Sequence, residues 1–105
     1  MKKFYLYLLT AVLFSCQSTQ DFLEQPQKGD IYLFESDGYY FPVMADIVQG
    51  DTVSCVNSKF VFTTSMPDQD DLPVEDFDFS FHLLSTKSEL QRLHQEGKIT
   101  EIIRP

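Results

Sequence analysis

The sequence predicts a small, mainly β domain of the α+β class, folded as an antiparallel barrel or roll of about five to six strands with one short helix before the last strand. Short apolar runs alternate with turn signals roughly every 8–12 residues, a spacing typical of antiparallel domains. A single helix signal occurs near the C-terminus. The 90 residues from Cys16 to Pro105, which follow a signal-like segment described below, are enough for one domain with one modest core.

The first two strands are predicted on either side of an Asp-Gly turn. Residues 31–34 (IYLF) are apolar at every position, which indicates a strand that is buried on both faces. Asp37-Gly38 can supply the positive φ angles that a tight hairpin needs. Residues 39–48 (YYFPVMADIV) form the second strand. Because Pro42 has no N–H to donate to a ladder, this strand should be an edge or bulged at that position.

Two further strands complete a predicted meander. Residues 49–51 form a turn, residues 52–56 (TVSCV) a third strand, and residues 59–64 (KFVFTT) a fourth, with Phe60 and Phe62 on one face. Such a meander would curl to hide its edge strands.

An acidic loop and an alternating segment follow. Residues 65–75 (SMPDQDDLPVE) contain two prolines and are predicted to be a loop. Residues 76–83 (DFDFSFHL) alternate apolar and polar side chains, which predicts a half-buried strand or extended segment. Its apolar face would comprise Phe77, Phe79, Phe81 and Leu83.

The helix is predicted from a capping box. Thr86 and Glu89 have the spacing of this motif, Leu90 and Leu93 lie three residues apart, and Gly97 provides a C-terminal stop. Residues 98–104 (KITEIIR) form the last strand. A small barrel with one short helix before its final strand resembles the Src-homology-3-type barrels, a resemblance of architecture that does not fix function.

The N-terminus has the features of a signal peptide, residues 1–15. Two lysines precede an apolar run over residues 4–14, which is shorter than the roughly 20 residues that a membrane-spanning helix needs. The segment Leu13-Phe14-Ser15-Cys16 resembles the lipobox of bacterial lipoproteins. This resemblance implies that Cys16 is the lipidation site, carries a thioether-linked diacylglycerol and becomes the mature N-terminus. The alternative is an ordinary secretory signal that is cut nearby, with Cys16 incidental.

The lipoprotein resemblance also implies a location in the bacterial cell envelope. Gln17 is not an aspartate, which in the enterobacterial sorting scheme favours the outer membrane, with the periplasmic or surface face left open. Residues 16–28 are polar and are predicted to form the lipidated N-terminus and a flexible tether. The ordered domain is then residues 29–105.

Charge limits the classes of partner. All sixteen acidic residues follow Cys16, against six basic ones, so the mature net charge is −10. A protein that binds nucleic acid needs a basic face to displace counterions, which argues against nucleic acid as a partner. A cationic protein is favoured electrostatically, although acidic charge also simply keeps small proteins soluble.

Two groups of residues are candidates for partner binding. The aromatic cluster Tyr39, Tyr40 and Phe41 lies beside a turn, and aromatic residues are enriched in interfaces. Asp68, Asp70 and Asp71 lie in the acidic loop. The alternatives are core packing for the aromatic residues and a solvated loop for the acidic ones.

No cofactor or metal site is predicted. Counted from Asp68, the loop has Leu72 and Pro73 where a calcium loop of the EF-hand type needs an oxygen ligand and a glycine. His82 and His94 are twelve residues apart, unlike the closer pairs of zinc sites. Cys55 shares a strand face with Val53 and is predicted to be a small buried residue.

We therefore expect an envelope lipoprotein with a small, non-enzymatic domain for binding or support. One alternative is an immunity-type protein that neutralises a basic toxin through charge steering. A second alternative is a minor envelope hydrolase, for which the sequence supplies no catalytic motif.

Overall fold

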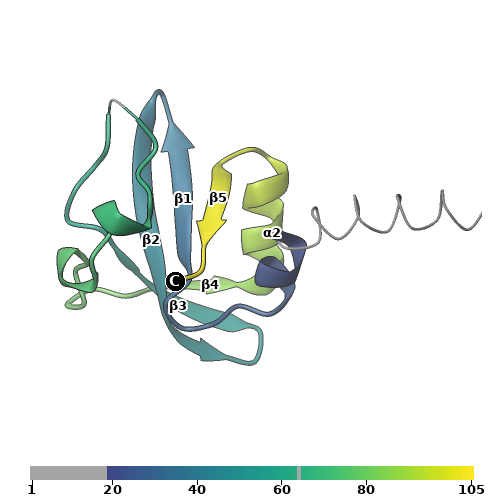
Figure 1. The fold of residues 1–105 in the computed structure, drawn as a ribbon. Helices are drawn as coiled ribbons and strands as arrows, with labels where there is room; N and C mark the ends of the chain where they lie inside the picture. Colours follow the sequence, from purple (N-terminus) through teal and green to yellow (C-terminus); the bar gives the residue numbers. More distant parts are fainter. Residues whose placement is uncertain (1–18, 64) are drawn as a thin grey trace, which may run out of the picture.

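A five-stranded antiparallel sheet with the strand order β4-β3-β2-β1-β5 forms the centre of the protein (Figure 1). The computed structural model describes residues 19–63 and 65–105, so Cys16 and the predicted signal peptide lie outside the described residues. The strands are β1 (Ile31–Ser36), β2 (Tyr39–Gln49), β3 (Thr52–Asn57), β4 (Leu83–Thr86) and β5 (Ile99–Ile103). Helix α2 (Lys87–Gln95) connects β4 to β5, and two 3-10 turns, η1 (Gln69–Asp71) and η2 (Val74–Asp76), lie in the connection from β3 to β4.

The mainly β class and the single helix before the last strand are confirmed, whereas the predicted barrel is not supported. The sheet stays open, with β4 and β5 at its edges. Its two faces are covered differently, by α2 and residues 19–24 on one side and by the connection from β3 to β4 on the other (Figure 1). Because these segments bury the apolar faces, the sheet does not need to curl on itself.

The first hairpin forms as the Asp-Gly signal predicts. Asp37 and Gly38 both have positive φ, 54° and 81°, as a two-residue hairpin turn requires. Pro42 lies within β2 next to the point where pairing with β3 ends, because the β3 register stops at Val43 opposite Asn57. The proline therefore interrupts no β2–β3 ladder.

Alternating side chains of the strands divide the core into two clusters. The helix-side core consists of Leu23, Tyr32, Ala45, Val53, Cys55, Leu90, Ile99 and Ile102. The loop-side core consists of Ile31, Leu33, Met44, Val56, Leu72 and Phe77. Successive residues of β1 contribute to opposite clusters, which confirms that this strand is buried on both faces.

Two predicted strands in the long connection are wrong. Within residues 59–63, only Phe62 makes a bridge, to Tyr40, and Phe60 is exposed. In residues 76–83, Phe77 is buried in the loop-side core, but residues 79 and 80 form a turn. The Asp78 carboxylate accepts a hydrogen bond from the Ser80 N–H at 3.0 Å, and this local turn overrides the alternating pattern. Phe79 and Phe81 are consequently exposed.

The folded domain also begins earlier than the predicted boundary at Gly29. Residues 19–24 are helical and Leu23 is buried in the helix-side core, so residues 19–28 do not form a flexible tether. Arg104 fixes this segment: its guanidinium lies 4.0 Å from the centroid of the Phe22 ring and donates to the Gln25 carbonyl at 3.1 Å. Arg104 also makes two 2.8 Å hydrogen bonds to the buried Asp30 carboxylate, to Oδ1 from Nε and to Oδ2 from Nη2.

Candidate functional site

Helix α2 leaves part of the helix-side face uncovered. It begins at Thr86, whose hydroxyl accepts a hydrogen bond from the Glu89 N–H at 3.2 Å, and Leu90 anchors it on the sheet. An open groove of about 390 Å³ remains between α2 and the sheet. It is lined by Phe34, Val43, Cys55 and Asn57 of the inner strands, by Leu83, Leu84 and Ser85 of β4, and by Glu89, Leu90 and Leu93 of α2. The lining is thus largely apolar, as in most binding sites.

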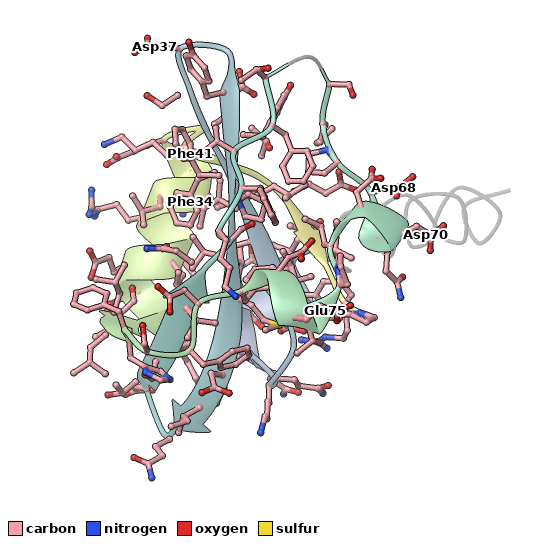
Figure 2. All side chains as sticks on the ribbon, turned by 90° about the vertical axis from the view of Figure 1, so that its left-hand side faces the viewer. Phe34, Asp37, Phe41, Asp68, Asp70 and Glu75 are labelled. Carbon is pink, nitrogen blue, oxygen red and sulfur yellow. The ribbon has the colours of Figure 1, made fainter. Side chains whose placement is uncertain are left out.

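Two of the predicted binding residues extend this groove. Phe41 pairs directly with Phe34 across β2 and β1, so the two side chains share the helix-side face (Figure 2). Tyr39 lies two residues before Phe41, on the same face, and the two ring centroids are 6.4 Å apart. Tyr39 and Phe41 are 46% and 39% exposed, so the aromatic surface continues beyond the groove into solvent.

Tyr40 lies on the opposite face of β2 and does not join the other two. Its N–H donates to the Phe62 carbonyl at 2.8 Å, and its carbonyl accepts from the Phe62 N–H at 3.0 Å. The predicted aromatic cluster is therefore a pair, Tyr39 and Phe41, next to a separate residue.

The acidic candidates lie elsewhere and have a local structural role. Asp68 Oδ1 accepts from the Asp70 N–H at 3.0 Å, and Asp71 Oδ2 accepts from the Asp68 N–H at 3.2 Å. These bonds form a capping box at η1. Figure 2 shows Asp68 and Asp70 on η1, apart from Phe41. The structure therefore does not bring the acidic and aromatic candidates together.

Cys55 lines the groove, and its thiol is buried. Burial raises the pKa of the Cys55 thiol to about 11, so it remains protonated near neutral pH. The predicted role of Cys55 as a buried residue beside Val53 is confirmed. His82 lies outside the groove, with Nε2 2.8 Å from Asp46 Oδ2.

The described residues contain neither a metal-binding cluster nor a membrane-spanning helix. Residues 19–63 and 65–105 hold no group of three or more His, Cys, Asp or Glu side chains arranged to bind a metal ion. In the same residues, no helix is long and apolar enough to cross a membrane.

The sequence predicts an aromatic cluster at Tyr39, Tyr40 and Phe41 but does not predict the groove. The groove combines residues from β1, β2, β3, β4 and α2, which only the folded chain brings together. The one sequence feature that could have indicated the groove is the adjacent pair Leu83 and Leu84, which lies between Phe81 and the predicted helix.

Comparisons with protein-family models, curated proteins and solved structures found no match to this chain.

Proposed function

We propose that the protein is an envelope lipoprotein, anchored through Cys16, whose small domain binds a partner protein without catalysis. The observation that carries the binding function is the open apolar groove and its continuation in Tyr39 and Phe41. A solvent-exposed apolar surface of this kind marks an interaction site in a monomeric domain. The anchor and its outer-membrane location depend on the lipobox resemblance and on Gln17.

We also propose a relationship to the Src-homology-3-type arrangement at the level of strand order. The support is the meander β1-β2-β3-β4, the helix that follows it, and the return of β5 to pair with β1. The proposed relationship concerns the order of the strands and not a barrel, because β4 and β5 do not pair with each other.

The immunity-type function is the second candidate, and the exposed acidic side chains favour it. In that case a basic toxin would bind the acidic loop rather than the groove. Asp70 is suited to test this, because its carboxylate makes no bond in the capping box, where Asp68 and Asp71 supply the acceptors. Charge reversal in Asp70→Lys therefore changes the surface without removing a cap.

The experiment has two separate measurements. Metabolic palmitate labelling should mark the wild-type chain and not Cys16→Ala, and labelling that persists in the variant would overturn the anchor. Binding is measured by crosslinking in membranes and mass spectrometry of the full chain. We expect a partner that is retained by Asp70→Lys and lost by Phe41→Ser, since Phe41 continues the groove. The reverse pattern would favour the immunity-type function.

A further inference from the structure

We propose that β4 is a docking strand: an extended segment of a cationic partner pairs with its open edge and places an apolar side chain in the groove. The docking segment would have apolar residues at alternate positions and basic residues between them. This inference rests on the proposed binding function and is independent of the Cys16 anchor.

The backbone of β4 has hydrogen-bonding groups on its outer side that find no partner among residues 19–63 and 65–105. The Lys87 N–H donates to the Asp51 carbonyl at 3.0 Å, which makes these two residues a hydrogen-bonded pair of the β3–β4 ladder. Hydrogen-bonded and non-hydrogen-bonded pairs alternate in antiparallel strands, and the register pairs Leu84 with Ser54 in a non-hydrogen-bonded position. The N–H and C=O of Leu84 therefore point away from β3. On that side of β4, the strand order of the described chain provides no further strand.

The side chains of β4 do not protect this edge. Natural proteins usually blunt edge strands with charged residues, yet Leu83–Thr86 contains none. Leu83 and Leu84 are 44% and 75% exposed. The opposite edge strand, β5, has the charged Glu101 within it. The contrast indicates that the β4 edge is kept open for a strand.

The groove lies where side chains of an added strand would point. Leu83 pairs with Cys55 and lines the groove, so the helix-side face of β4 opens into it. A strand paired with β4 would lie roughly 4.8 Å away and direct every second side chain to that face. Main-chain hydrogen bonds then supply affinity, and the groove selects an apolar side chain, as in other cases of strand addition.

Charge favours a cationic partner over a second copy of this chain. Basic side chains near α2 are already engaged, with Lys87 4.0 Å from Asp51 and Arg92 2.9 Å from Glu96. Glu89 is likewise paired, 3.8 Å from Arg92, so the attraction comes from the overall charge: the described part of the chain holds sixteen acidic and six basic residues. A second copy would bring the same excess of negative charge, whereas lysines between apolar residues complement it.

The probe is a capped peptide that alternates lysine with valine and leucine, Lys-Val-Lys-Leu-Lys-Val-Lys. It is titrated into the full chain in detergent micelles, with fluorescence anisotropy as the readout. We expect saturable binding that Leu84→Lys weakens by about tenfold or more, equivalent to about 1.4 kcal/mol. Val74→Lys is the matched control, because it makes the same change at an exposed aliphatic residue in η2 and should leave the affinity unchanged.

A second peptide isolates the backbone contribution. The same sequence with alternate N-methyl groups keeps its side chains and charge but loses donors for pairing, so we expect it to bind at least about tenfold more weakly. Equal binding of the two peptides would overturn strand pairing, as would the absence of saturable binding or an equal effect of Val74→Lys.

Sedimentation of the full chain in detergent tests whether a second copy of this chain pairs with the β4 edge instead of a cationic partner. A concentration-dependent dimer that Leu84→Lys abolishes would assign the edge to a second copy and overturn the proposal. A monomer that binds the unmethylated peptide supports it. Neither result depends on palmitate labelling, so failure of the anchor and failure of the docking strand are distinguishable.

Discussion

Two polar groups are buried in the helix-side core, the Cys55 thiol and the Tyr32 hydroxyl. Burial raises the pKa of both groups, and the nearby Asp30 carboxylate raises that of Tyr32 further. The Tyr32 hydroxyl has no hydrogen-bond partner among residues 19–63 and 65–105. The core therefore favours the neutral form of each group, which makes the fold sensitive to alkaline pH.

Cys55→Ala should reduce the loss of stability at alkaline pH. The thiol pKa is raised from 9.0 to about 11, so between these values the unfolded chain releases a proton that the folded chain retains. Stability then falls as pH rises through this window, by up to about 2–3 kcal/mol for a shift of this size. The measurement is urea unfolding of both proteins near neutral pH and near the top of the window. An identical alkaline loss in the variant would refute this role for the thiol.

At the scale of elements, the sequence predicts the fold where local and tertiary preferences agree. β1, β2, β3, α2 and β5 all formed at or near their expected bounds because turn residues, caps and apolar runs are consistent there. The two strands that were predicted but did not form both lie in the β3–β4 connection. In residues 76–83 the apolar and polar side chains alternate, but the hydrogen bond from the Ser80 N–H to Asp78 forms a turn instead of a strand. Only Phe77 of this segment is then buried in the loop-side core.

The candidate site was less predictable than the fold. The exposed pair Tyr39 and Phe41 could be found from composition beside a turn, but the groove depends on distant elements and on how far α2 covers the sheet. The sequence did not indicate the local role of the acidic residues, in which the Asp68 and Asp71 carboxylates accept hydrogen bonds from backbone N–H groups in the capping box of η1.

Alanine substitutions at Phe77 and Phe81 test the corrected structure of this connection. The alternating pattern makes the two equivalent, whereas Phe77 is 2% exposed and Phe81 is 60% exposed. Phe77→Ala should lower the free energy of unfolding by about 3–5 kcal/mol through loss of burial and a residual cavity. Phe81→Ala should change it by less than about 0.5 kcal/mol. Chemical denaturation measures both, and equal losses would restore the alternating strand.

At the scale of the whole molecule, Arg104 joins the two ends of the described chain. Its guanidinium connects β1 through Asp30 with the N-terminal segment through Phe22 and Gln25. The Gln27 N–H also donates to Asp30, at 2.9 Å. This ion pair and the buried Leu23 side chain together hold residues 19–28 against the sheet.

Arg104→Met should be strongly destabilising, because it leaves the carboxylate of Asp30, which is 1% exposed, without its cation. We expect a loss of about 3–5 kcal/mol, as for other buried pairs that lose one partner. Arg92→Met is the matched control, since the Arg92–Glu96 pair is solvent-exposed and should contribute little to stability. Thermal unfolding compares the variants, and similar melting temperatures would contradict the role of Arg104.

The packed N-terminal segment limits how the protein can search for its partner. If Cys16 carries the lipid, only Gln17 and Ser18 separate it from the helical segment that begins the described chain. Three residue steps extend at most about 11 Å. A domain attached to its lipid through so short a linker stays close to the membrane surface. It would find its partner by lateral diffusion in the plane of the membrane, and the partner would have to present its docking segment at the lipid surface.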